Sequence, residues 1–419
     1  MIKHETDGDV TVPLARILGK KTGLVSDLEY TLPYRRQPIE VKTAQGQTVD
    51  IGNLTNDEAS GASIEAMGKG ATLRQSITTM LAEAVERGVY YIGAHRGVEA
   101  SYEELSAEHE VIDTEYLQFY SERTREQLDH YETYYPLDKF ETRSWICGRN
   151  LLSGDRTYVP IELVFPHKGV NERPLFMATT NGMACHKTLP QSLLESIYEF
   201  VERDSVMYTW WTRTVPDRLE TDQFVTENET VRFHLLNLET GVNIPTVGCL
   251  GISAERSRPY AFFCAASDST YPEAIRSAIW EASQCWSWHT THSSGDLGGI
   301  DPQNITDLTS NVIYYQSPDN YDALEFLLDG PLRSIDRIEN FSGFSSPKAE
   351  LAHVLDILES HGVTPIGFDL TTPDIQELGL TVTRVVIPEL LQLSLPSFPT
   401  DAHPRLNGRV KTVDPHPHG

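Results

Sequence analysis

The sequence predicts an α+β protein, in which mixed sheets and helices form one large unit with internally repeated helix motifs. Apolar residues recur at helical spacing over residues 72–91, 189–211 and 272–289. Alternating, strand-like runs such as 145–165 and 247–252 separate these helices. Because no low-complexity linker divides the chain, we expect a single compact unit.

Strand and helix patterns continue on either side of these segments. A polar, tyrosine-rich stretch predicts helix over about residues 103–132. Further on, 347–359 predicts a helix, and 312–316, 364–369 and 382–387 predict strands. The last hundred residues therefore alternate strand and helix again.

The composition describes an acidic, water-soluble globular protein. The formal net charge of −26 argues against a nucleic-acid binder, because phosphate backbones need a positive surface. Acidic residues are scattered and Lys is scarce beside Arg, which fits a surface adapted to high salt or one that is acidic for other reasons. No run approaches the roughly 20 apolar residues that cross a membrane.

The start of the chain and its cysteines predict a cytoplasmic protein. The polar, acidic segment 1–7 lacks the basic and apolar parts of a signal peptide. Five cysteines without a Cys-x-x-Cys pair favour neither a disulfide framework nor a zinc knuckle. A reducing compartment fits best, and most of the cysteines should be core residues.

One helical pattern occurs three times. Three segments align without gaps: Glu83-Ala84-Val85-Glu86-Arg87, Glu199-Phe200-Val201-Glu202-Arg203 and Glu281-Ala282-Ser283-Gln284. Residues three apart share a helix face, so each copy projects two oxygen-bearing side chains from one stripe. Mg²⁺ takes oxygen ligands and shares them with phosphates, so converging stripes could hold metal ions against a nucleoside triphosphate.

A single Glu-x-x-Glu-Arg would be better explained as a solvated helix face with local ion pairs. Three copies flanked by apolar residues favour a buried site instead. Arg87 and Arg203 could either lock the glutamates or meet phosphate oxygens. A carboxylate-bridged di-metal bundle expects Glu-x-x-His, which no copy has, and there is no P-loop motif.

In combination, these motifs resemble the YcaO family, and in particular its azoline-forming cyclodehydratase branch. Gly68-Lys69-Gly70 with Thr79, Glu83 and Glu86 is similar to the family's first motif. The second and third are matched by Thr180-Asn181-Gly182-Met183-Ala184 with 199–204, and by Glu281 with Gln284. The segments 369–374 and 385–388 are similar to the run before the family's C-terminus, so the resemblance covers nearly the whole chain.

The resemblance implies ATP and Mg²⁺ as cofactors. The implied metal ligands are Glu83, Glu86, Glu199 and Glu202. The candidate nucleotide-binding residues are Lys69, Thr79, Glu83, Glu86, Arg87, Asn181, Gln191, Glu199, Glu202, Arg203, Arg276, Glu281 and Gln284. Gln191 stands where the family commonly has glutamate, and His186 where it has glycine, which leaves the number of Mg²⁺ ions open.

The resemblance also implies a reaction. A Cys, Ser or Thr side chain of a ribosomally made precursor peptide attacks the preceding amide, ATP phosphorylates the resulting oxygen, and loss of phosphate leaves an azoline. Since no leader-binding module is visible, we expect a leader-peptide-binding partner protein, and a homodimer is possible. We divide the chain into an N-terminal strand region (1–60), an ATP-binding catalytic domain (61–405) and a Pro/His-rich tail (406–419).

The tail, Pro415-His416-Pro417-His418-Gly419, resembles the Pro-x-Pro-x-Pro terminus of that branch but closes with glycine. We predict that His416 or the terminal carboxylate of Gly419 is the catalytic base; a frayed terminus or tag remnant is the alternative. Two histidines at helical spacing, His289 and His292, predict polar surface more than a metal pair.

Two other functions are compatible with the sequence. One is a backbone thioamide-forming enzyme, which keeps ATP and the amide chemistry but which the tail disfavours. The other is a non-catalytic, ATP-binding regulatory subunit, for which Gln191 is the motive.

Overall fold

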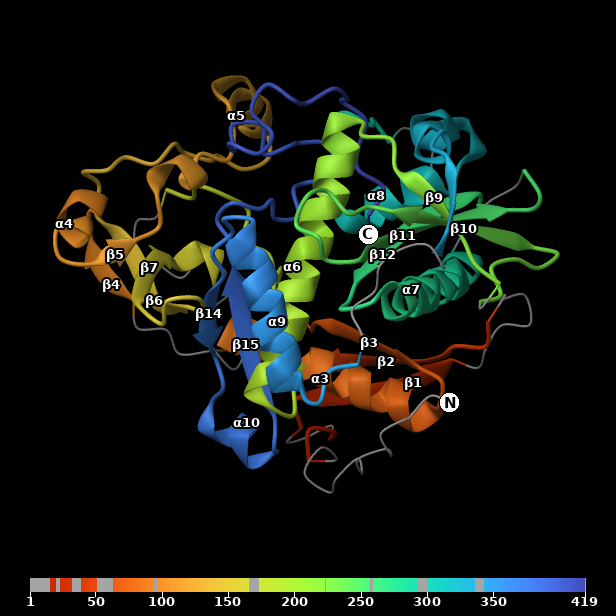
Figure 1. Cartoon of the computed structure of the whole chain (residues 1–419), viewed down its shortest axis with the longest axis horizontal. Helices are drawn as coiled ribbons and strands as arrows, with labels where there is room; N and C mark the ends of the chain where they lie inside the picture. The colour runs from red at the N-terminus through yellow and green to blue at the C-terminus, as the bar shows by residue number, and fades with distance from the viewer. Residues whose placement is uncertain are drawn as a thin grey trace.

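A computed structural model gives the structure of the chain as a mixed arrangement of helices and sheets, as predicted (Figure 1). It describes residues 16–19, 23–31, 39–50, 63–92, 97–165, 173–222, 224–256, 259–292, 300–335 and 343–418. Residues 1–15 of the predicted N-terminal strand region (1–60) lie outside these ranges. Within them, three sheets surround one central helix.

The first sheet is antiparallel and has the order β1-β2-β3, with β1 at Val25–Thr31, β2 at Lys42–Thr48 and β3 at Glu65–Gly70. Helix α3 (Leu73–Ile92) packs across it and buries Met80, Leu81 and Val85. A side chain at Gly68 would collide with the backbone of α3, so the close approach of β3 and α3 requires glycine there.

The second sheet has the order β12-β11-β10-β9-β13. Its strands are β9 (Asp217–Glu220), β10 (Val231–Asn237), β11 (Thr246–Ser253), β12 (Ala261–Ser267) and β13 (Leu332–Ser334). Helix α7 (Tyr271–His292) lies across this sheet and buries Ala278, Ile279 and Ala282 against it. Helix α7 also faces the first sheet, so a space walled by α3 and α7 lies between the two (Figure 1).

The strand predicted at 312–316 is wrong, because helix α8 (Leu308–Tyr315) occupies most of that segment. Asp307 caps this helix: its side chain accepts a hydrogen bond from the backbone N–H of Ser310 at 2.8 Å. A short 3₁₀ segment, η4 (Pro318–Leu328), follows. The segment is short and rich in apolar residues, and such a run is compatible with a buried strand as well as with a helix.

The third sheet has the order β5-β7-β6-β14-β15-β8, and β4 pairs with β6. Its strands are β4 (Val98–Ala100), β5 (Glu110–Val111), β6 (Arg143–Asn150), β7 (Arg156–Pro160), β8 (Met183–His186), β14 (Ile366–Asp369) and β15 (Thr381–Val386). A 3₁₀ turn, η3 (Ile161–Leu163), follows β7.

The long helix predicted over 103–132 is wrong in its extent. The segment contains α4 (Tyr102–Ser106), η2 (Thr114–Leu117) and α5 (Glu122–Leu128). Ser101, Asp113 and Ser121 each cap the start of one of them with the side chain. A cap satisfies the free backbone N–H groups of a new helix start, so three caps divide the stretch into three short elements.

Helix α6 (Leu189–Thr212) stands at the centre of the molecule (Figure 1). It packs on β15 and β8 on one side, on β11 and β12 on the other, and on α9 (Pro347–Ser360). Trp210 and Trp211 near its end are fully buried. A shorter helix, α10 (Pro373–Glu377), precedes β15.

The three long helices predicted from periodicity are confirmed as α3, α6 and α7, within three residues at each end. They bring the three copies of the glutamate pattern to the middle of the molecule. Among the described residues, no helix is both long and apolar enough to span a membrane.

Candidate functional site

A cavity of about 720 Å³ opens between α3, β3, α7 and α8. Its lining contains Glu65, Met67, Gly68, Lys69, Thr79, Glu83, Glu86, Arg87, Glu195, Glu281, Gln284, Cys285, Trp288, His289, Leu308, Thr309 and Val312. This volume is in the range of small-molecule sites in proteins, roughly 300–1,000 Å³. Carboxylates and cations line this cavity together with the apolar side chains of Trp288, Leu308 and Val312.

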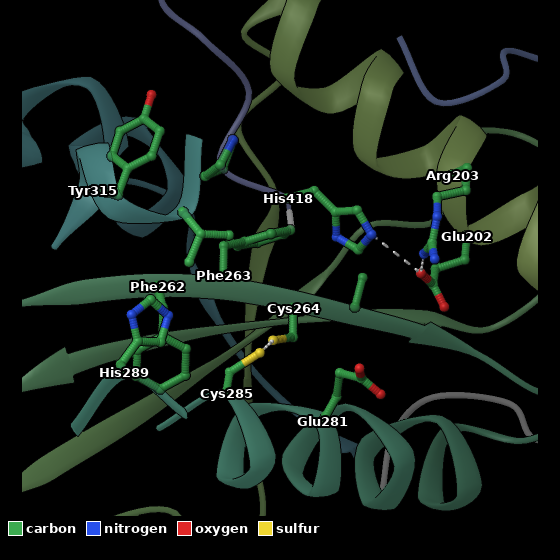
Figure 2. Close-up of a pocket in the computed structure, with 13 residues that line it drawn as sticks. Glu202, Arg203, Phe262, Phe263, Cys264, Glu281, Cys285, His289, Tyr315 and His418 are labelled. Atoms are coloured by element: carbon green, nitrogen blue, oxygen red, sulfur yellow. Dashed lines mark hydrogen bonds and ion pairs between the residues drawn. The ribbon is translucent and has the colours of Figure 1, made fainter. Parts of the chain in front are cut away.

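A smaller cavity of about 110 Å³ adjoins the first, because Glu281, Cys285, His289 and Val312 line both. Helix α6 contributes Glu202 and Arg203 to its wall, and β12 contributes residues 262–265. Figure 2 shows these side chains around the smaller cavity, with His418 pointing toward Glu202. The two cavities together bring α3, α6 and α7 to one place.

A network of hydrogen bonds joins α3 to β3 at this wall of the cavity. Glu83 Oε2 accepts from the backbone N–H of Met67 at 2.8 Å, and its Oε1 lies 2.7 Å from Arg87 Nη2. Arg87 Nη1 donates to the carbonyl of Glu65 at 3.1 Å. Thr79 donates its hydroxyl to the carbonyl of Lys69 at 3.0 Å. These bonds fix the carboxylate of Glu83 and the backbone of Lys69 relative to each other.

Glu86 is half-buried in the floor of the cavity. Burial raises its pKa well above the ordinary value, and the negative charges of Glu199 and Glu83 raise it further. Glu86 therefore faces carboxylates from its own helix and from α6. Crowded carboxylates of this kind are stabilised by a cation between them.

On α6, Glu199 lines neither cavity but contacts Arg203, which lines the smaller one. The backbone N–H of Gly182 donates to Glu199 Oε2 at 3.1 Å, and Arg203 Nη2 lies 3.4 Å from Glu199 Oε1. Gly182 has a φ of 75°, and a side chain there would collide with the carbonyl of Val385, so this contact requires glycine. Arg203 also forms an ion pair with Glu202. Burial raises the pKa of Glu199, although the charges of Arg203 and Arg384 oppose this shift.

The wall from α7 carries the third copy. Glu281 forms an ion pair with Lys69 of β3, which joins α7 to the first sheet across the cavity. Gln284 is 8% exposed, and its Nε2 has no hydrogen-bond partner among the described residues. A buried amide donor that lines a cavity is ready to bind an acceptor atom of a ligand.

The donor set fits Mg²⁺ and a polyphosphate. Glu83 and Glu86 on α3 and Glu199 and Glu202 on α6 offer only oxygen donors, which suit a hard cation. Lys69 and the two arginines supply the opposite charge for phosphate oxygens. Within the described ranges, however, no three His, Cys, Asp or Glu side chains stand in a ready metal-binding group. Arg87 pairs with Glu83, and Arg203 pairs with Glu199 and Glu202.

Five of the predicted site residues that the structure describes line neither cavity: Glu199, whose contacts are given above, and four that lie elsewhere. Asn181 is buried, and its Oδ1 accepts from the N–H of Leu393 at 2.9 Å. Gln191 accepts from the Thr188 hydroxyl at 2.8 Å at the start of α6. Arg276 pairs with Glu273 one turn away on α7. The fourth, His416, is described below.

The tail is buried, which is contrary to a frayed terminus. Asn311 Nδ2 donates to the carbonyls of His416 and His418 at 2.7 and 3.0 Å, and residue 418 forms a parallel β-bridge with Phe263 of β12. His416 is fully buried, and its Nε2 lies 3.0 Å from the carbonyl of Ser394 rather than at a cavity. Gly419, the other predicted catalytic residue, lies outside the described residues.

Pro417 and His418 of the tail both line the smaller cavity, and sequence reasoning did not select His418. Its Nε2 lies 3.9 Å from Glu202 Oε1, and neither ring nitrogen has a hydrogen-bond partner among the described residues. Burial and the charge of Arg203 lower the pKa of this imidazole well below its usual value. The ring is therefore neutral at neutral pH.

Arg384 of β15 was also missed. It is 1% exposed, and its Nη1 donates to the carbonyl of Val164 at 3.0 Å. Its positive charge acts on both Glu199 and Glu86 and favours their charged forms. A lone arginine in the apolar run of β15 was the available signal, because a buried cation needs a negative partner.

His289 was predicted at the surface, but it is 2% exposed and lines both cavities. Its Nδ1 lies 2.7 Å from Gln316 Nε2, and burial lowers its pKa to about 3. This imidazole is therefore neutral at physiological pH. The side chain of His292 lies outside what the structure describes.

Asp268, which directly follows β12, is expected to make the free energy of unfolding depend on pH. Burial raises its pKa to about 6, with a further contribution from Glu273 and Glu350. A carboxyl whose pKa is higher in the folded state contributes stability at low pH that is lost as the pH rises through the folded value. We expect Asp268→Asn to gain about 1–2 kcal/mol of unfolding free energy relative to the unchanged protein between pH 5 and pH 8.

Urea unfolding of both proteins at the two pH values measures this gain. The matched control is Asp356→Asn, at an exposed position on α9, which should change the difference little. A gain of similar size in the control, or none in Asp268→Asn, would contradict the assignment of the shift to Asp268.

Fold and site together define a mixed α/β protein with an acidic cavity walled by glutamate-bearing helices. Residues 67–391 match the family model described as YcaO cyclodehydratase, ATP- and Mg²⁺-binding. The chain therefore belongs to the YcaO family, whose cofactors are ATP and Mg²⁺. No curated protein matches the chain.

Solved structures share the fold. A heterocyclase in complex with substrate and cofactor is 19% identical with a TM-score of 0.73, over 97% of this chain and 57% of that one. The heterocyclase TruD is 20% identical with a TM-score of 0.60, over 76% and 46%. YcaO from Methanopyrus kandleri, bound with AMPPCP and Mg²⁺, is 18% identical with a TM-score of 0.60, over 94% and 91%. This chain thus spans about half the length of the first two.

Proposed function

We propose that this protein is an ATP-dependent cyclodehydratase that activates backbone amides by phosphorylation and forms azolines in a ribosomally made peptide. The observation that carries the proposal is the convergence of three glutamate-bearing helices on adjoining cavities, with Lys69 and two arginines beside them. When bound, Mg-ATP supplies the phosphoryl group that turns a poor leaving group, the amide oxygen, into a good one. The heterocyclases that share the fold support the same reaction class.

The residues divide the work by charge. Glu83, Glu86, Glu199 and Glu202 would hold Mg²⁺ through their carboxylate oxygens. Lys69, Arg87 and Arg203 would meet phosphate oxygens, and Gln284 would donate its free N–H group. The apolar lining residues Trp288, Leu308 and Val312 suit a nucleobase.

The tail would serve the substrate side of the reaction. The attacking side chain of the peptide must lose a proton, and a neutral imidazole within reach can accept it. His418 meets this requirement better than His416, because it lines the smaller cavity and has free ring nitrogens. The precursor peptide, a leader-binding partner protein and a homodimer remain our proposed partners.

The position of Gln191 weakens the motive for a non-catalytic subunit. Its side chain is bonded to Thr188 and does not line the described cavities, so an amide there does not remove a carboxylate from them. The thioamide-forming alternative shares every cofactor contact proposed above. Only the product distinguishes it.

Two measurements test the proposal. The first is release of ADP and phosphate from Mg-ATP, with and without a precursor peptide encoded beside the gene. The second is mass spectrometry of that peptide after incubation with the enzyme and its proposed partner. We expect a loss of one water mass per ring; exchange of oxygen for sulfur would favour the thioamide enzyme, and intact nucleotide binding without turnover would favour the regulatory subunit.

A further inference from the structure

Two thiols line the smaller cavity, and one of them, that of Cys285, also lines the larger cavity. Cys264 lies on β12 and Cys285 on α7, and their sulfur atoms are 3.1 Å apart, with the Cys264 thiol as donor (Figure 2). Both line the smaller cavity, and both are free thiols. None of the roles proposed above uses them.

We propose that Cys264 and Cys285 are a thiol–disulfide modification site, at which a small-molecule disulfide closes an intramolecular bond. A disulfide bond is roughly 2.05 Å long, so the sulfur atoms need to approach by only about 1 Å. Strand β12 and helix α7 already pack together in one core, which leaves side-chain rotation as the main movement. The bond would join the helix to the strand beside the cavity.

The two thiols differ in access, which sets the order of events. Cys285 is half-buried and lines both cavities, whereas Cys264 is 3% exposed and lines only the smaller one. The Cys285 thiolate attacks one sulfur of the small disulfide, which releases one small thiol and leaves a mixed disulfide. The Cys264 thiolate then attacks the Cys285 sulfur and releases the second small thiol. Two protein thiols are oxidised and one small disulfide is reduced to two thiols.

The modification would act on the site through its neighbours. Glu281 lies one turn before Cys285 on α7, and Phe263, next to Cys264, bridges the tail at residue 418. A bond between the cysteines would tie the helix that carries Glu281 to the strand that holds the tail. An effect of this bond on nucleotide binding rests on the proposed function, which places nucleotide in the larger cavity beside Cys285.

The test uses the reduced full-length chain and oxidised glutathione, followed by intact mass measurement and peptide mapping. We expect a linked pair of peptides that contain Cys264 and Cys285, and an intact mass that is lower by two hydrogen atoms once the glutathione adduct on Cys147 is subtracted. Cys264→Ser should leave a stable glutathione adduct on Cys285, whereas Cys285→Ser should leave Cys264 reduced. The exposed Cys147 reports in every sample that the reagent is active.

Another buried cysteine, Cys249, provides the matched control. Cys249 of β11 lies directly opposite Cys264 in the antiparallel ladder, so it is the alternative partner. Cys249→Ser should leave the bond between Cys264 and Cys285 unchanged. A bond between Cys249 and Cys264, or both thiols still reduced in the unsubstituted chain while Cys147 is modified, overturns the proposal.

A further arm separates this inference from the proposed function. Magnesium with AMPPCP at saturating concentration should slow formation of the bond at least about tenfold, because bound ligand excludes the reagent. If the bond forms at an unchanged rate, the thiol site is supported and the placement of nucleotide beside Cys285 is overturned.

Discussion

Glu199→Gln is expected to lower ATP turnover by at least about 100-fold while the chain stays folded. Glutamine can still accept the hydrogen bond from the N–H of Gly182, so the local backbone has no reason to move. What is lost is the negative charge that faces Arg203 and is proposed to hold Mg²⁺. Release of ADP measures turnover, and circular dichroism with thermal unfolding shows whether the fold persists.

The matched control for this variant is Glu359→Gln, an exposed glutamate at the end of α9 that has no role in the proposed site. It should leave turnover unchanged. Glu83→Ala and Glu202→Ala should lower turnover in the same direction as Glu199→Gln. A folded Glu199→Gln protein that keeps more than about a tenth of the original rate would contradict the assignment of the site.

Arg405→Met is expected to cost about 3–5 kcal/mol of unfolding free energy, because it strands a buried carboxylate. Asp204 follows Arg203 on α6 and its side chain is fully buried. Arg405 binds both of its oxygens, with Nε and Nη2 each at 2.6 Å, and the N–H of Leu391 donates to Oδ1 at 2.8 Å. This pair fastens the C-terminal segment to α6 directly behind the candidate site.

The pH dependence of Arg405→Met gives a second sign to check. Burial raises the pKa of Asp204, and Arg405 is the main group that opposes the shift. Without the arginine the folded-state pKa rises further, so the stability deficit should shrink as the pH falls and Asp204 takes up a proton. Urea unfolding at several pH values measures this trend.

The double variant Asp204→Asn with Arg405→Met tests the cause. Asparagine can still accept from the N–H of Leu391 but carries no charge, so much of the lost stability should return. A double variant that is less stable than Arg405→Met, or an Arg405→Met protein that loses under about 1 kcal/mol, would show that the buried charge is not the source of the effect.

Local pattern explains which parts of the fold were predictable. The three long helices and the spacing of the glutamate pairs are properties of neighbouring residues, and the structure confirms α3, α6 and α7. The predictions for residues 103–132 and 312–316 were wrong because the helices there begin at side-chain caps. Apolar periodicity does not report such caps.

The predicted site residues also fall into two groups, those that line the cavities and those that do not. Lys69, Thr79, Glu83, Glu86, Arg87, Glu281 and Gln284 line the larger cavity, and Glu202 and Arg203 line the smaller one. Asn181, Gln191, Glu199 and Arg276 belong to the same motifs but do not line the described cavities. A motif shows which segments approach a site, whereas the direction of each side chain depends on its own hydrogen bonds.

The sequence by itself determined the family resemblance, the three glutamate-bearing helices and the residues that each could present, because spacing along a helix fixes which side chains share a face. Only the tertiary structure decided what meets across the cavity: Lys69 with Glu281, Arg384 beside Glu86 and Glu199, and Cys264 with Cys285. It also brought His418 rather than His416 to the cavity. Those contacts join segments far apart in the chain, and their geometry depends on the packing of whole sheets and helices.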